Sequence, residues 1–61
     1  MNDIIARYIE SEGISQAELA RRIGVSEAMV SRMLDGSRRP GLRVALAMSR
    51  EMRIPVERFA Q

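Results

Sequence analysis

The chain has 61 residues, a formal net charge of +2, and neither cysteine nor histidine. This composition excludes disulfides, thiolate nucleophiles, imidazole bases and the usual zinc ligands, so we expect no metal site, no cofactor and no enzyme activity. The length predicts a single small domain over residues 1–61, and the longest apolar run, residues 44–48, is too short to cross a membrane, which favours a reducing, cytoplasmic setting.

The N-terminal segment has the pattern of an amphipathic helix. Asn2 or Asp3 can cap its start, and Gly13 can end it. Apolar side chains that recur at helical spacing predict the buried stripe of this helix: Ile4, Ile5, Tyr8 and Ile9.

Two helix-start signals eleven residues apart, Ser15 and Ser26, predict a helix-turn-helix over about residues 15–36. At the first of these start signals, Ser15 can cap a helix over residues 16–23. Glu18 can reach back to the Ser15 amide as in a capping box, or it can pair with Arg21 or Arg22 on the outer face. Gly24 can end this helix because glycine tolerates a positive φ, so the chain can turn sharply into the next helix.

The second start predicts a helix over residues 27–34 that Gly36 ends. A helical wheel places Val30, Met33 and Leu34 in one sector, which we expect to be buried. The opposite face is small and mixed, as insertion into a DNA major groove requires. Four candidates for reading bases lie on or beside it: Glu27, Ala28, Ser31 and Arg32.

Each candidate has a specific chemistry. Arg32 can donate two hydrogen bonds to guanine, Ala28 can touch a thymine methyl group, and Ser31 can serve a base or a phosphate. Glu27 can accept a hydrogen bond from a cytosine amine, or it can simply favour the positive N-terminus of the helix.

Basic residues are concentrated from the end of the first helix of this motif onward. Residues 1–20 hold one arginine and four acidic side chains, whereas residues 21–61 hold nine arginines and four acidic side chains. Gripping the phosphate backbone without reading sequence is the role we expect for four side chains: Gln16 at the start of its helix, and Arg38, Arg39 and Arg43 beyond the recognition helix.

The remaining sequence predicts two more helical segments. A polar loop rich in Gly and Pro, residues 37–41, precedes a helix over residues 42–52, and Pro55 begins a short turn of helix carrying Val56 and Phe59. The apolar side of the longer helix is predicted to be Leu42, Ala45, Leu46, Met48, Ser49 and Met52. The predicted fold class is therefore all-α, with five helices in a bundle.

These features together resemble the Cro/C1-type (XRE) helix-turn-helix family, whose fold is that of lambda repressor-like DNA-binding domains. The resemblance covers roughly residues 2–60. It is carried by Ser15-Gln16-x-x-Leu19-Ala20, Gly24-Val25-Ser26, Val30-Ser31, Gly36, Arg39-Pro40 and the closing residues 54–59. It implies a bundle of five helices that dimerises on a palindromic operator, a phosphate-clamping role for Gln16, and base reading by Glu27, Ala28 and Arg32.

The chain departs from the family pattern at three positions. Leu34 stands where the family often has glutamate, so an ion pair back to the preceding helix is not expected. Arg53 stands where glycine is usual, and Pro55 where a small capping residue is usual, which makes the dimer contacts of that region the least transferable feature.

We therefore expect a sequence-specific regulator of transcription that binds double-stranded DNA. Its simplest form is a Cro-like repressor from a phage or prophage, acting as a homodimer in a bacterial or phage-infected cell. The alternative is an antitoxin whose main partner is a toxin protein and whose DNA binding serves autoregulation, although antitoxins normally carry a further segment that residues 1–61 do not provide. A purely structural helical bundle is the third interpretation.

Overall fold

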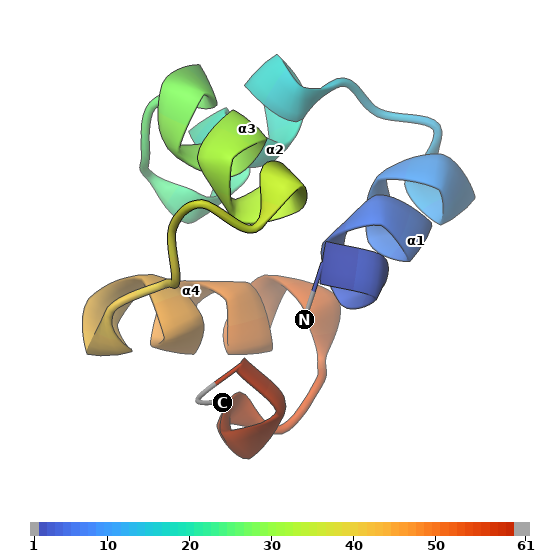
Figure 1. The fold of residues 1–61 in the computed structure, drawn as a ribbon. Helices are drawn as coiled ribbons and strands as arrows, with labels where there is room; N and C mark the ends of the chain where they lie inside the picture. The colour runs from blue at the N-terminus through green and yellow to red at the C-terminus, as the bar shows by residue number, and fades with distance from the viewer. Residues whose placement is uncertain (1, 60–61) are drawn as a thin grey trace.

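Five helical segments make up the part of the chain that the computed structural model describes, residues 2–59 for the backbone and 4–59 for the side chains (Figure 1). They are α1 (Asn2–Glu12), α2 (Gln16–Ile23), α3 (Glu27–Asp35), α4 (Leu42–Met52) and η1 (Val56–Phe59). No strand occurs in these residues, so the all-α class is confirmed. The expected count of five helices is wrong in detail, because η1 is one 3₁₀ turn and four segments are α-helices.

Serine caps and glycine ends set the limits of α2 and α3. The Ser15 Oγ accepts a hydrogen bond from the Glu18 amide at 3.0 Å, and the Ser26 Oγ accepts one from the Met29 amide at 3.1 Å. Gly24 follows α2 with φ +76°, a conformation that strains residues with a Cβ. Because only residues 24–26 separate α2 from α3, the chain forms the predicted helix-turn-helix.

The predicted capping box at Ser15 is only half made. Glu18 does not reach back to the Ser15 amide; its carboxylate instead accepts hydrogen bonds from Arg21 Nε at 3.0 Å and from Arg22 Nε at 2.9 Å. Sequence spacing allowed both outcomes. Two guanidiniums provide stronger, charge-assisted hydrogen bonds than one neutral amide, which explains why the carboxylate turns toward α2.

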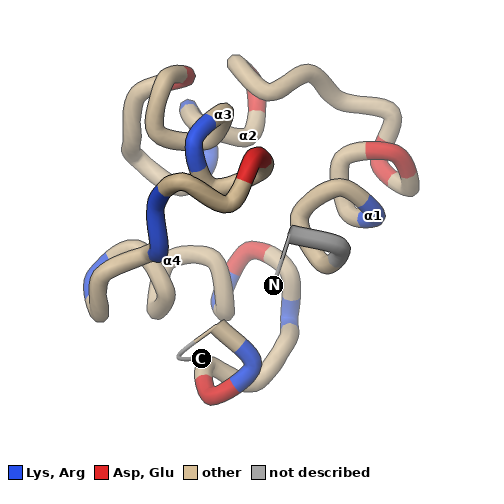
Figure 2. Tube along the Cα trace, viewed as in Figure 1, with Lys and Arg blue, Asp and Glu red and all other residues tan. Residues whose placement is uncertain are grey.

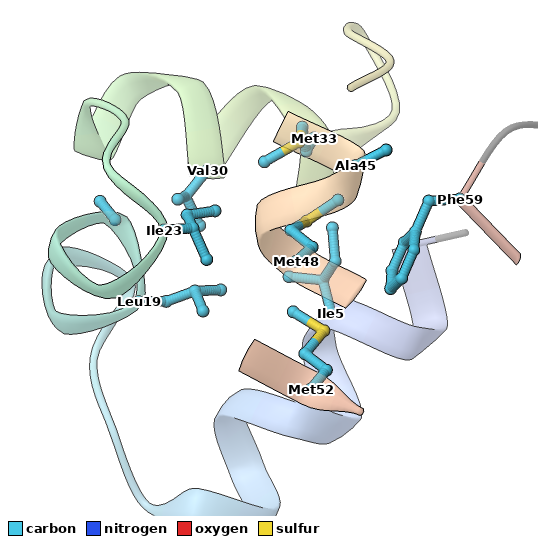
Figure 3. Packing of buried hydrophobic residues seen from close by; sticks show 10 residues of the cluster. Ile5, Leu19, Ile23, Val30, Met33, Ala45, Met48, Met52 and Phe59 are labelled. Carbon is cyan, nitrogen blue, oxygen red and sulfur yellow. The ribbon is translucent and has the colours of Figure 1, made fainter. Parts of the chain in front are cut away.

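The core lies where the five segments meet. α3 packs against α1 and α2, while α4 packs against α2 and η1. Figure 3 shows the buried side chains converging from every segment; among the described residues they are Ile5, Leu19, Ala20, Ile23, Val30, Met33, Ala45, Met48, Met52 and Phe59. Burying one large apolar side chain contributes about 1.5–3 kcal/mol, so this cluster is the main stabilising feature of so short a chain.

Two predicted apolar stripes divide into buried and unburied positions. On α3, Val30 and Met33 are buried as predicted, whereas Leu34 is half-buried against the core. On α4, two of the predicted apolar positions, Leu42 and Leu46, are 74% and 41% exposed. The core-facing side of α4 is narrower than its apolar pattern and consists of Ala45, Met48 and Met52, which are buried.

Three further expectations concern the end of α1, the cap at its start, and whether a helix could span a membrane. Gly13 ends α1 with φ +64° as predicted. The proposed caps, the side chains of Asn2 and Asp3, lie outside the described residues. Over the described range, none of the helices has the length and apolar character needed to span a bilayer.

Arg53 ends α4 in a conformation that favours glycine. Its φ of +58° and ψ of +42° are left-handed, which costs a residue with a Cβ about 1–2 kcal/mol. We expect Arg53→Gly to raise the free energy of unfolding by about 0.5–1 kcal/mol, after allowing for the greater freedom of glycine in the unfolded chain. Thermal denaturation checks this. Arg53→Ala is the matched control: it removes the same side chain but keeps the strain, so an equal gain in both variants contradicts the explanation.

Candidate nucleic-acid interface

The outer face of α3 is open along its length. All four predicted base-reading residues, Glu27, Ala28, Ser31 and Arg32, are exposed there. Val30 and Met33 anchor the opposite side in the core, so the helix cannot rotate without losing that packing. The structure therefore brings the four candidates together on one rigid surface, while their individual base contacts stay predictions.

A hydrogen-bonded turn leads from α3 into the basic loop. Gly36 adopts φ +83°, and the Arg32 carbonyl accepts hydrogen bonds from the amides of Ser37 at 3.0 Å and Arg38 at 3.3 Å. The Ser37 amide also donates to Asp35 Oδ1 at 2.7 Å. Hydrogen bonds from Ser37 lower the pKa of Asp35, so this carboxylate stays charged and braces the turn. The turn fixes where the arginines of the loop begin.

Three predicted phosphate contacts follow one another along the chain after α3. Arg38 and Arg39 lie in the loop after α3, and Arg43 lies in the first turn of α4; all three are exposed. Figure 2 shows basic positions in blue from α3, through this loop, to the start of α4. A path of this kind can contact successive phosphates on one side of a groove.

Gln16 stands apart from the arginines in both position and exposure. It is the first residue of α2 and is half-buried. The N-terminus of a helix favours an anion because its first amides point outward and the helix dipole is positive there. Since α2 packs against α3, a phosphate held at Gln16 would help to orient α3. The phosphate contact itself is untested.

The arginines of α2, Arg21 and Arg22, form ion pairs within the fold, unlike the arginines of the loop after α3. Arg22 Nη1 lies 3.3 Å from Glu51 Oε2 of α4, and it donates to Tyr8 Oη of α1 at 3.4 Å. Tyr8 in turn donates to Glu51 Oε2 at 2.7 Å. The sequence predicted Tyr8 only as a packing residue and did not single out Glu51. The two residues are 43 positions apart, so no local spacing connects them. Together with Glu18, these residues tie three helices into one charged network.

This network predicts a dependence of stability on pH. Hydrogen bonds from Arg21 and then Arg22 lower the pKa of Glu18 to about 2 from its ordinary value of 4.5. Because the folded-state pKa is the lower one, the stabilisation is present above the unfolded-state pKa and is lost as the pH falls toward about 2.

We expect Glu18→Gln to be less stable than the parent chain at about pH 6, with the difference vanishing near pH 2. Urea denaturation over this range measures it. Glu10→Gln is the matched control, since Glu10 forms no ion pair with the described residues. A Glu18→Gln deficit that persists unchanged at the lowest pH argues against the ion pairs as its source.

Comparisons with known proteins are consistent with this geometry. Residues 5–59 match the family described as "Helix-turn-helix". Over 39 residues the chain is 46% identical to a protein of Bacillus subtilis (strain 168) named "Uncharacterized HTH-type transcriptional regulator YvzC"; the similarity covers 64% of this chain and 51% of that protein. The chain thus spans about half the length of this relative. No solved structure matches significantly.

Proposed function

The chain belongs to the Cro/C1-type helix-turn-helix family, and on this basis we propose that it is a sequence-specific DNA-binding regulator of transcription. The observation that carries the proposal is the distribution of arginine partners. In the described part of the chain, Arg21 and Arg22 form ion pairs, whereas Arg32, Arg38, Arg39 and Arg43 form none. Other arginines, such as Arg7 and Arg50, are also without an ion pair there, but these four lie together on the exposed face of α3 and directly beyond it, where a duplex can approach.

We further propose that it acts as a Cro-like repressor. One recognition helix reads only a few base pairs, so useful affinity and specificity require two protomers whose α3 helices enter major grooves roughly 34 Å apart. Two identical protomers related by a two-fold axis read a palindromic operator. Repression then follows from occupying a promoter. The name of the B. subtilis relative, an HTH-type transcriptional regulator, supports a role in regulating transcription.

Selection of bound duplexes from a random pool tests the proposal directly. We expect enriched duplexes with two inverted half-sites whose centres lie about one helical turn apart. An enriched pool without inverted half-sites contradicts the dimeric repressor, and a failure to bind any duplex at low salt contradicts DNA binding altogether.

The salt dependence of binding provides a further prediction. If each protomer neutralises about four phosphates with its arginines, the dimer releases counterions with a log–log slope of roughly −7. Titrations of the selected duplex at several salt concentrations measure this slope. A slope near zero excludes the phosphate contacts as a main source of affinity.

A further inference from the structure

The helix α1 carries more apolar surface than the core covers. Its predicted buried stripe is Ile4, Ile5, Tyr8 and Ile9, but Ile5 alone of these four is buried and the other three are half-buried. Ile4 and Tyr8 border a shallow hollow between α1 and the segment of residues 54–58. We call it the α1 hollow, and the side chains that line it are Ile4, Arg7, Tyr8, Ser11, Ile54 and Arg58.

Hydrogen bonds hold both walls of the α1 hollow in place. On the α1 side, the lining residues recur at helical spacing and so share one face, and Tyr8 Oη donates to Glu51 Oε2 at 2.7 Å. On the other side, the Ile54 carbonyl accepts a hydrogen bond from Ser49 Oγ at 2.6 Å, and the Ile54 amide donates to the Ser49 carbonyl at 3.3 Å. The hollow is therefore preformed, so a partner does not have to order it.

The charged side chains that line the α1 hollow are both positive. Arg7 of α1 and Arg58 of η1 are exposed, and neither enters an ion pair with the described residues, although acidic side chains lie close to both in the sequence. Ile4 and Ile54 add apolar surface beside them, one from each wall. The hollow thus combines an apolar floor with two guanidiniums that lack a partner among the described residues.

The size of the α1 hollow favours a protein segment over a small molecule. Its volume is about 300 Å³, which is at the lower end for pockets that hold small ligands and that bury roughly 70–90% of the ligand surface. The α1 hollow is open to solvent, so it cannot enclose a ligand in that way. A peptide segment can instead seat one side chain in the hollow and make further contacts along α1 and η1.

We propose that the α1 hollow binds an amphipathic, acidic segment of a partner protein. A large aliphatic side chain of the segment packs on Ile4 and Ile54, while carboxylates on either side of it pair with Arg7 and Arg58. Apolar anchors of an amphipathic helix that enter a groove are a recurring mode of peptide recognition, and charge complementarity fixes which helix fits. Each exposed ion pair contributes little by itself, so binding requires the apolar contact and both ion pairs together.

The α1 hollow lies away from the surface proposed for DNA. In Figure 1, α4 lies between η1 and α3, and α1 lies across the molecule from the loop of residues 37–41. A bound segment therefore leaves the outer face of α3 accessible, so the partner and a duplex can be held at the same time. This inference goes beyond the proposed function, and the hollow binds its segment or fails to do so whether or not the chain binds DNA.

A synthetic peptide of about 15 residues, with leucine and glutamate at helical spacing, is the probe. Fluorescence anisotropy measures its affinity for the whole chain. We expect Arg7→Gln/Arg58→Gln to bind this acidic peptide about tenfold more weakly than the parent, because both ion pairs are lost. The matched control is Arg38→Gln/Arg39→Gln, which removes the same charge from a distant loop and should stay within about twofold of the parent. All four positions are exposed, and circular dichroism checks that both variants keep the fold.

Two control peptides separate charge from apolar contact. Lysine in place of every glutamate reverses the charge, and serine in place of every leucine keeps the charge but removes the apolar side chains. Each should bind the parent at least about tenfold more weakly than the acidic peptide does. Amide NMR shifts caused by the acidic peptide should cluster in residues 4–11 and 54–58, and an excess of the selected duplex should leave the affinity for the peptide unchanged.

Four results overturn the proposal. The first is no binding at about 1 mM acidic peptide, where even a weak site is half filled. The second is displacement by the duplex or a larger loss in Arg38→Gln/Arg39→Gln, which would place the peptide on the DNA-binding surface. The third is equal binding of the serine peptide, which would leave only unspecific attraction of charge. The fourth is binding of phosphatidylglycerol vesicles through Arg7 and Arg58 without binding of the peptide, which would assign the hollow to a membrane surface. Binding of the peptide by a chain that binds no duplex overturns the proposed function instead.

Discussion

Replacing Arg32 by alanine is expected to remove the base preference at one position of each half-site. Arg32 is exposed on the outer face of α3, and its guanidinium makes no ion pair with the described residues. Its two parallel donors match the O6 and N7 acceptors of guanine, a contact worth about 1–3 kcal/mol. Because a dimer makes this contact twice, at well-separated positions, the loss on the cognate duplex should reach about 2–6 kcal/mol.

Comparison with Arg39→Ala separates base reading from general electrostatics. Arg39 lies in the basic loop, and we expect its loss to weaken cognate and random duplexes equally and to reduce the salt slope by about one for each protomer. Arg32→Ala should instead weaken the cognate duplex much more than the random one. Competition titrations of both variants on both duplexes measure the difference. Equal losses for Arg32→Ala on the two duplexes would show that Arg32 contacts phosphate and not base.

Local signals in the sequence predicted most helix limits correctly. Ser15, Ser26 and Gly24 act through the few residues beside them, so their geometry follows from sequence spacing alone. The limits of α2 and α4 agree with the prediction, and α3 extends one residue further, to Asp35. The 3₁₀ form of η1 was not predicted, because a single turn between Pro55 and the C-terminus is too short for any periodicity to distinguish it from an α-helix.

Features that depend on distant contacts could not be read from the sequence. The pairing of Tyr8 with Glu51 joins α1 to α4, and no local pattern marks it. The exposure of Leu42 and Leu46 has a related cause: periodicity identifies an apolar face, but how much of it is covered depends on the width of the neighbouring elements. At the candidate site, the outer face of α3 was predictable because the burial of Val30 and Met33 fixes the opposite side. Which atoms of DNA that face contacts depends on the duplex, so those assignments remain proposals.

Phe59 fastens η1 to the rest of the molecule. It is 1% exposed and belongs to the same buried cluster as Ile5 of α1 and Met48 of α4, and the half-buried Val56 packs against that cluster too (Figure 3). Truncating a buried phenylalanine to alanine typically costs about 3–5 kcal/mol, through lost burial and the cavity left behind. A single core in a chain of this size rarely supplies more than about 3–5 kcal/mol in total.

Phe59→Ala is therefore expected to be largely unfolded at 25 °C. Phe59→Leu, which keeps most of the apolar volume, should remain folded with a lower melting temperature. Circular dichroism checks both variants, and a folded Phe59→Ala would mean that η1 contributes little to the core.

The Phe59→Ala variant also links folding to the proposed function. A ligand that binds only the folded state stabilises it by about 2.7 kcal/mol at one hundred times its dissociation constant, so excess selected duplex should restore much of the helical signal. A random duplex, which binds more weakly, should restore less. Equal recovery with both would show that binding stabilises the fold without reading the sequence.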